Sequence, residues 1–167
     1  MKILILLIMA FNFLAIQNVY AQNKSKFQKI KWISFKKAVF SNNKVKKPFF
    51  LEFYAPYCDY CIQMEKKVFY RGKVIKIINK YFYPVKINIE GNKTVKFFNG
   101  KHYSKKLLSI KLNVMGTPTA IFYSSGLKKI FTLPGYWNED DFVLVARWIA
   151  KKKYKIESLR KYYKEIK

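Results

Sequence analysis

Cysteine and histidine are scarce in this chain, and each shortage narrows the classes of function. The sequence has 2 cysteines and 1 histidine among 167 residues. A small secreted domain that relies on disulfides usually carries several, so burial of apolar side chains must stabilise this one. The single histidine, His102, leaves no Ser–His–Asp arrangement, and a structural zinc ion needs four ligands. We therefore expect no metal site and place His102 in a surface loop.

Acidic residues and arginine are also few. The chain has 9 Asp and Glu against 34 Lys and Arg, a formal net charge of +25. Such a charge attracts phosphate, but only Arg71, Arg147 and Arg160 are arginines, and arginine is the side chain best suited to grip phosphate and base edges. We therefore expect solvated lysine faces and no nucleic-acid partner. Contact with an anionic membrane surface or an acidic partner is the alternative role for this charge.

The first 21 residues have the features of a secretory signal peptide. Lys2 is the only charge before a nearly continuous apolar run from Ile3 to Phe13, and Val19-Tyr20-Ala21 approximates a small-residue cleavage site. The alternative is an uncleaved N-terminal membrane anchor. In either case we expect the rest of the chain to lie in the periplasm or another extracytoplasmic compartment.

The remaining residues predict one α/β domain. The spacing of apolar residues predicts helices over residues 34–43, 59–70, 74–81, 104–112 and 138–150. It predicts strands over residues 49–54, 85–89, 117–123 and 128–133. Residues 27–32 are expected to form a first strand or an extended lead-in, and residues 91–100 a loop. This alternation indicates an α/β sandwich.

Two helical segments carry expectations about which side chains are buried. In residues 104–112, Leu107, Leu108 and Ile110 are expected to face the core. The basic tail has apolar residues at helical spacing and is expected to form an extra amphipathic helix docked on the domain, with a membrane-surface helix as the alternative. These tail residues are Ile156, Leu159, Tyr163 and Ile166.

Both cysteines lie in one C-x-x-C, formed by Cys58 and Cys61 directly after the apolar run Phe49–Tyr54. This order predicts a strand that delivers two thiols to the start of a helix. The amide N–H groups of a helix N-terminus favour thiolate on the first cysteine, and thiolate is the nucleophile of disulfide exchange. The motif therefore predicts a thiol–disulfide oxidoreductase whose only redox group is its own dithiol.

The segment Phe50–Cys61, together with Gly116-Thr117-Pro118-Thr119, resembles the thioredoxin superfamily. Residues 64–88 resemble, more narrowly, bacterial periplasmic thioredoxin-related proteins of the SoxW type. The resemblance implies a three-layer sandwich with a mixed central sheet. The expected organisation is a signal peptide (1–21), a lead segment (22–30), a thioredoxin-like domain (31–153) and a basic amphipathic C-terminal helix (154–167).

The resemblance also implies roles at the site. Cys58 is expected to be the exposed nucleophile of low pKa, and Cys61 the more buried resolving thiol. Pro118 matches the family's cis-proline, which lies against the dithiol and presents backbone groups to an extended substrate; an ordinary trans proline opening a strand is the alternative. The other residues expected to contact substrate are Gly116, Thr117, Tyr57, Asp59 and Tyr60.

Glu52 is an acid inside an otherwise apolar strand, where a carboxylate is costly without a partner or a task. It matches the position where thioredoxins carry a buried acid beneath the second cysteine. We therefore expect Glu52 to have a raised pKa and to transfer protons to and from Cys61. The alternative is an ion pair with Lys86 on the neighbouring strand.

The direction of electron flow is left open by the residues between the cysteines. The family's familiar Gly-Pro is replaced by Asp59-Tyr60, and Asp59 places negative charge beside Cys58, which disfavours thiolate there. We favour net reduction of disulfides in exported proteins, with electrons from a membrane donor of the DsbD type, as the resemblance implies. The alternatives are a DsbA-like oxidase, for which the short stretch between Cys61 and Pro118 leaves little room, and a non-enzymatic binding or chaperone module.

Overall fold

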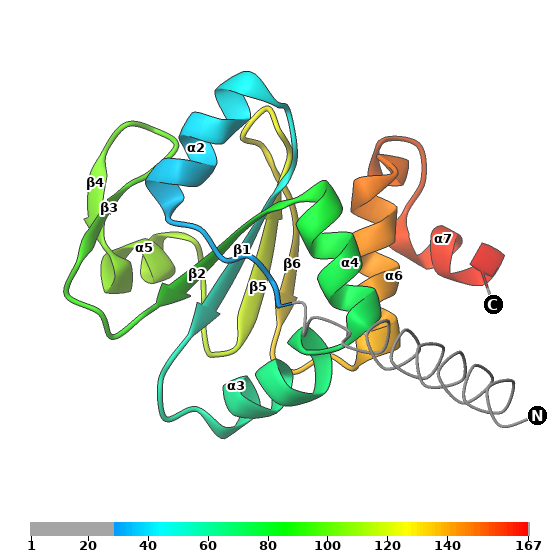
Figure 1. Ribbon diagram of the computed structural model, residues 1–167, viewed down its shortest axis with the longest axis horizontal. Helices are drawn as coiled ribbons and strands as arrows, with labels where there is room; N and C mark the ends of the chain where they lie inside the picture. The colour runs from blue at the N-terminus through cyan, green and yellow to red at the C-terminus, as the bar shows by residue number, and fades with distance from the viewer. Residues whose placement is uncertain (1–28, 167) are drawn as a thin grey trace, which may run out of the picture.

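A four-stranded mixed sheet lies between two layers of helices in the computed structural model, which describes residues 29–166 (Figure 1). The strand order is β2-β1-β5-β6. Strand β1 (Phe49–Tyr54) runs parallel to β2 (Tyr83–Asn88) and antiparallel to β5 (Thr119–Tyr123), and β5 pairs antiparallel with β6 (Lys129–Pro134). The expected α/β sandwich with a mixed central sheet is confirmed.

The helices divide between the two faces of this sheet. One face is covered by α2 (Phe35–Lys44) and α5 (Lys105–Lys111), and the other by α4 (Gly72–Tyr81) and α6 (Glu139–Ala150) (Figure 1). The remaining elements are α3 (Asp59–Met64), the π-helical turn η1 (Glu65–Phe69), the 3₁₀ turn η2 (Lys153–Lys155), α7 (Leu159–Ile166), β3 (Thr94–Lys96) and β4 (His102–Ser104). Among residues 29–166, none of the helices combines the length and the apolarity needed to cross a bilayer.

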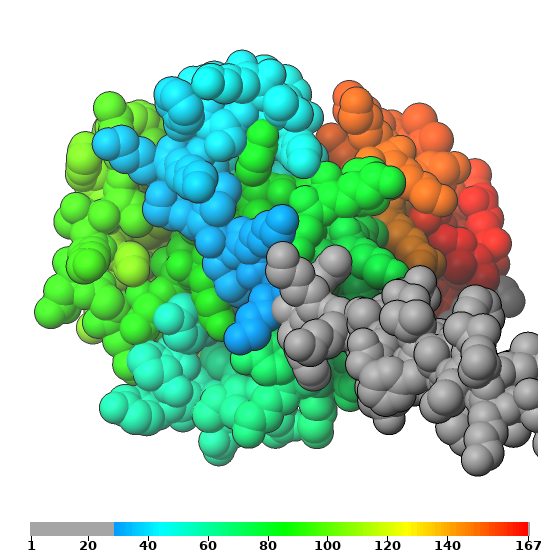
Figure 2. All heavy atoms as spheres, in the orientation of Figure 1, coloured from blue at the N-terminus to red at the C-terminus, as the bar shows by residue number. Residues whose placement is uncertain are grey.

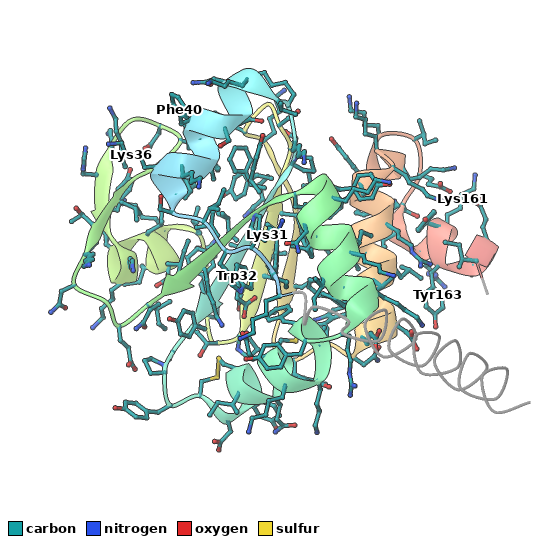
Figure 3. The ribbon with its side chains drawn as sticks, in the orientation of Figure 1. Lys31, Trp32, Lys36, Phe40, Lys161 and Tyr163 are labelled. Atoms are coloured by element: carbon teal, nitrogen blue, oxygen red, sulfur yellow. A yellow bond between two sulfur atoms is a disulfide. The ribbon has the colours of Figure 1, made fainter. Side chains whose placement is uncertain are left out.

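The expected signal peptide, residues 1–21, and residues 22–28 of the expected lead segment lie outside the described residues. Residues 29–34 form an extended lead-in and not a strand: a single backbone bond, from Ile33 N–H to the Pro84 carbonyl at 3.0 Å, ties them to β2. In Figure 2 this lead-in (dark blue) runs across the front of the molecule between α2 and α4. Trp32 lies inward from it, whereas Phe40 lies on the outer side of α2 (Figure 3).

Strand β1 is central because both of its faces are apolar, as its sequence predicts. Phe49, Leu51 and Phe53 are buried on the α2 side, and Phe50 is buried on the α4 and α6 side. Because side chains alternate along a strand, Glu52 emerges on the same side as Phe50. The strand therefore delivers an acid toward the layer that also contains the cysteine helix.

Phe50 anchors the larger of the two cores, where its ring contacts those of Trp32, Phe69, Phe122 and Phe142. Replacing it with alanine should lower the free energy of unfolding by about 3–5 kcal/mol, because the lost burial is accompanied by a cavity. Urea unfolding followed by circular dichroism measures this. The matched control is Phe40→Ala on the exposed side of α2, which should change stability by less than about 0.5 kcal/mol; equal losses for the two variants would contradict this account of the core.

Three local expectations are wrong. Residues 91–100 are not only a loop, because β3 pairs antiparallel with β4. In α5 only Leu108 of the three expected core residues is buried, while Leu107 and Ile110 are exposed. The helix has seven residues, too few turns to present a broad apolar face.

The third concerns the tail, where the buried side chain is Tyr162 and not the expected stripe. Leu159 is partly buried against the core, but Ile156 and Ile166 are exposed. Ile156 lies outside the helix, because the 3₁₀ turn η2 ends at Lys155 and α7 begins only at Leu159. A C-terminal helix docked on the domain is nevertheless present.

Candidate active site

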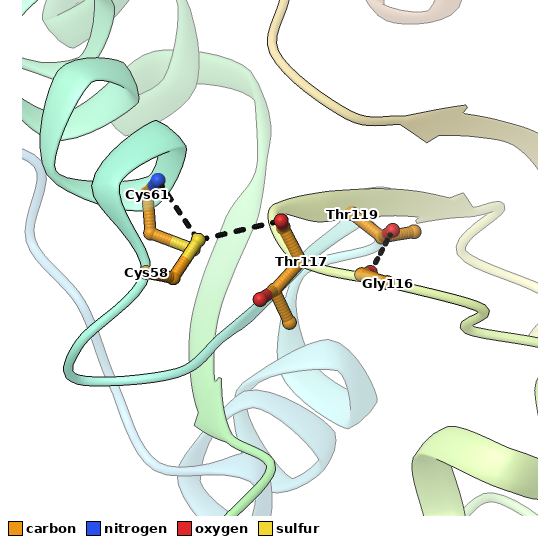
Figure 4. Close-up of a disulfide and its surroundings, with 5 residues drawn as sticks. All are labelled: Cys58, Cys61, Gly116, Thr117 and Thr119. Atoms are coloured by element: carbon orange, nitrogen blue, oxygen red, sulfur yellow. Dashed lines mark hydrogen bonds between the residues drawn. A yellow bond between two sulfur atoms is a disulfide. The ribbon is translucent and has the colours of Figure 1, made fainter.

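The two cysteines lie where β1 ends and α3 begins. Cys58 is the N-cap of α3, and its Sγ accepts a hydrogen bond from the Cys61 backbone N–H at 3.1 Å (Figure 4). The two residues form a disulfide with their Cα atoms 5.2 Å apart. Cys58 is partly exposed, whereas Cys61 is 8% exposed. An incoming thiolate therefore reaches the Cys58 sulfur more readily than the Cys61 sulfur.

The loop before β5 lies against this disulfide. Cys58 Sγ is 3.3 Å from the Thr117 carbonyl oxygen (Figure 4), which the reduced thiol is placed to use as a hydrogen-bond acceptor. The peptide bond between Thr117 and Pro118 is cis. Thr119 Oγ1 donates to the Gly116 carbonyl at 2.7 Å, and the Gly135 N–H donates to the Pro118 carbonyl at 2.8 Å. These bonds hold the loop from both sides, so backbone groups beside Cys58 have a defined position.

The surface around Cys58 carries large exposed side chains. Tyr57 is 90% exposed, and Tyr60, Asp59 and Gly116 are also exposed, while Thr117 is partly exposed and Pro118 buried. Met115 is 95% exposed and was not singled out by the sequence, which contains no local signal that distinguishes an exposed methionine from a buried one. Exposed apolar side chains beside a reactive group are typical of a surface that contacts other proteins.

Glu52 is 1% exposed, and its Oε2 atom has no hydrogen-bond partner within the described residues. Burial raises the pKa of Glu52 well above its ordinary value; the positive charge of Lys86 opposes this rise in pKa, and the negative charge of Glu65 adds to it. Desolvation is the largest of the three effects because water stabilises a carboxylate far more than a carboxylic acid. Glu52 therefore carries a proton under conditions in which an exposed glutamate has lost it.

Lys86 does not pair with Glu52, although the two residues are opposite each other in the register of β1 and β2. The Lys86 ammonium binds the carboxylate of Glu65, so the alternative of a Glu52–Lys86 ion pair is not the arrangement found. Glu65 was missed in the sequence, where its position one helical turn after Cys61 was the available signal.

A pocket of about 230 Å³ joins these groups. Glu52, Cys61, Glu65 and Lys86 all line it. Glu52 and Cys61 therefore open onto one space, through which a proton can exchange between Glu52 and solvent. Among the described residues, no group of three or more His, Cys, Asp or Glu side chains is placed to hold a metal ion, and His102 is exposed on strand β4 and not in a loop.

Residues 35–148 match the family described as Thioredoxin-like domain. The chain belongs to this family. No curated protein matches the sequence. The two cysteines at the start of α3 and the family together identify this thioredoxin-like protein as a thiol–disulfide oxidoreductase.

Solved structures with the same fold include a thioredoxin-fold protein from Helicobacter pylori, which is 25% identical with a TM-score of 0.64 over 83% of this chain and 90% of that chain. The DsbH oxidoreductase is 17% identical with a TM-score of 0.59, over 77% of this chain and 87% of that one. The reduced C-terminal domain of Neisseria meningitidis DsbD is 18% identical with a TM-score of 0.51, over 67% and 90%. These likenesses extend over most of the thioredoxin-like protein.

Proposed function

We propose that this thioredoxin-like protein reduces disulfides in exported proteins and is reduced in turn by a membrane donor of the DsbD type. The observation that supports reduction over oxidation is the make-up of the chain between Cys61 and Pro118. After α3 it consists of η1, α4, β2, the short β3–β4 hairpin and α5; β2 is a strand of the central sheet, and the other elements belong to the layers on its two faces. A DsbA-like oxidase carries an inserted helical domain in this stretch, and the described residues here leave no segment for one.

The site supports a cycle of two thiol exchanges. The Cys58 thiolate attacks a substrate disulfide, forming a mixed disulfide and releasing one substrate thiolate. Cys61 then transfers its proton to the Glu52 carboxylate and attacks Cys58 Sγ, so the second substrate thiolate leaves and the Cys58–Cys61 bond forms. Two electrons have passed from the dithiol to the substrate, whose two thiolates take protons from solvent. Reduction by the donor reverses these steps, and Glu52 returns its proton to Cys61.

Substrate is proposed to bind across the surface around Cys58. The backbone of Gly116, Thr117 and Pro118 would align an extended segment beside the sulfur, with Tyr57, Asp59 and Tyr60 contacting its side chains. The exposed tyrosines and the open position of Cys58 support a protein substrate over a small thiol. We also propose that the protein is of the narrower SoxW type and that residues 1–21 are cleaved. The rest of the chain would then lie outside the cytoplasm, where its basic tail would contact an anionic membrane.

The reduction potential tests the direction of electron flow. Equilibration of the purified protein with dithiothreitol or glutathione buffers should give a value near that of thioredoxin, about −270 mV, which suits a reductase. A value toward about −120 mV, as in a strong oxidant, would overturn the proposed direction while leaving the thiol–disulfide chemistry intact. Cys58→Ser is the control, because a protein with one thiol has no internal disulfide to titrate.

A further inference from the structure

The ammonium group of Lys86 is held by three partners beside the active site. It binds the Glu65 carboxylate, and it lies 4.8 Å from the centroid of the Tyr54 ring and 5.5 Å from that of the Trp32 ring. The side chains of Lys86 and Glu65 are 26% and 24% exposed, so water screens this ion pair only in part. The cage therefore fixes the position of a cation at the wall of the Glu52 pocket.

The register of the sheet makes this position unexpected. Lys86 and Glu52 are Cα partners on parallel strands, so their side chains leave the sheet side by side on one face. A cation that close to a buried carboxylic acid with an unpartnered oxygen would ordinarily pair with it and leave it ionised. In the structure the cation binds Glu65 instead.

Glu65 reaches Lys86 because of its place on the cysteine helix. It stands four residues after Cys61, on the same helical face, and its N–H donates to the carbonyl groups of Cys61 and Ile62. Its own carbonyl accepts a hydrogen bond from the Tyr70 N–H at 3.1 Å, which is a bond of the wide π-helical turn η1. The backbone that presents Cys61 therefore also presents the carboxylate that holds Lys86.

We propose that Glu65 is a positioning residue that holds the Lys86 ammonium away from Glu52, so that Glu52 keeps its proton until Cys61 needs it. The inference rests on the proposed proton transfer between Glu52 and Cys61. When a donor thiolate attacks Cys58 Sγ, the Cys58–Cys61 bond breaks and its electron pair goes to the Cys61 sulfur. Glu52 gives that sulfur its proton and remains a carboxylate, which accepts the proton again when Cys61 next attacks the mixed disulfide.

The charges around Glu52 predict shifts of opposite direction for two substitutions. Lys86 faces Glu52 from β2, and Glu65 faces it from η1. The other titratable side chains that line the pocket are those of Lys66, Tyr54 and Tyr70. On β5 the neighbour of Glu52 is Ala120, which does not titrate. Glu65→Gln removes a negative charge and frees Lys86 to approach, and both changes lower the pKa of Glu52. Lys86→Met removes the positive charge and raises the pKa of Glu52.

Carboxyl ¹³C NMR of the oxidised protein measures the titration midpoint of Glu52 directly. The Glu52 resonance is identified as the one that is missing in Glu52→Gln. The Glu52 titration midpoint should move down in Glu65→Gln and up in Lys86→Met, and thermal unfolding confirms that both variants are folded. Lys66→Met, which removes an exposed cation from the same pocket, and Glu165→Gln, which breaks the distant pair with Lys161, should leave the midpoint in place. An unmoved midpoint in Glu65→Gln, or movement of both variants in one direction, overturns the inference.

A second readout separates this inference from the role of Glu52. Reduction of the disulfide by dithiothreitol at pH 8 should be slower in Glu65→Gln than in the wild-type protein, approaching the loss of about 10²-fold expected for Glu52→Gln. If the Glu52 midpoint moves in Glu65→Gln but Glu65→Gln and Glu52→Gln are both reduced at the wild-type rate, Glu65 positions Lys86 and the proton-transfer role of Glu52 is wrong. If Glu52→Gln is slow while Glu65→Gln has the wild-type midpoint and rate, the role of Glu52 stands and Glu65 has no part in it.

Discussion

Replacing Cys58 by serine is expected to abolish disulfide exchange, reducing the rate of reduction of a protein disulfide to that of the buffer alone. The hydroxyl of serine cannot form the mixed disulfide, and Cys61 is too buried to take over the attack. The complementary variant, Cys61→Ser, should trap a covalent complex between Cys58 and its substrate, because the resolving thiol is missing. A coupled dithiothreitol–insulin assay and non-reducing gels measure the two effects.

The same pair of variants decides between an enzyme and a binding module. A binding module would retain its affinity for unfolded or extended proteins in Cys58→Ser, and its wild-type dithiol would not exchange on a timescale of minutes. Equal rates for Cys58→Ser and the wild-type protein, together with retained affinity, would therefore show that the protein acts by binding and not through the dithiol. Thermal unfolding of each variant provides the control for folding.

Replacing Glu52 by glutamine is expected to slow resolution of the mixed disulfide by about 10²–10⁴-fold, the usual contribution of a positioned acid–base group. Glutamine keeps the shape of the side chain but can neither accept the Cys61 proton nor return it. Rapid-quench measurement of the mixed disulfide across pH isolates this step, since formation of the mixed disulfide depends on Cys58. A glutamine variant with the wild-type rate at every pH would remove Glu52 from the mechanism.

Glu52→Gln should also change the pH dependence of stability. The folded protein raises the pKa of Glu52 above its value in the unfolded chain, so between these two pKa values the unfolded state binds fewer protons and stability falls as pH rises. Glutamine does not titrate, and the variant should therefore gain stability relative to the wild-type protein above about pH 4.3 and match its pH dependence below. Urea unfolding at several pH values tests this; Glu165→Gln, an exposed carboxylate, should show no comparable gain.

Much of the fold follows from local patterns in the sequence. The apolar run at Phe49–Tyr54 predicts a central strand, because only a strand covered on both faces can bury consecutive large side chains, and the first five of these six are buried. Ser34 and Asn138 predict helix starts because their side chains cap free N–H groups, and both do so here. Where local patterns compete with packing they fail: Leu107 and Ile110 have helical spacing but are exposed, since α5 has seven residues and buries only Leu108 and Ser109.

The sequence by itself determined the chemistry of this protein. Three features can be read directly from the chain: a C-x-x-C after an apolar strand, an acid within that strand and a Thr-Pro pair later on. Each of them restricts the chemistry that the site can perform. The tertiary structure alone decided which groups meet. It placed the Thr117 carbonyl 3.3 Å from Cys58 Sγ and paired the Lys86 ammonium with the Glu65 carboxylate and not with Glu52. Such choices depend on contacts between residues far apart in the chain, whose distances no local spacing contains.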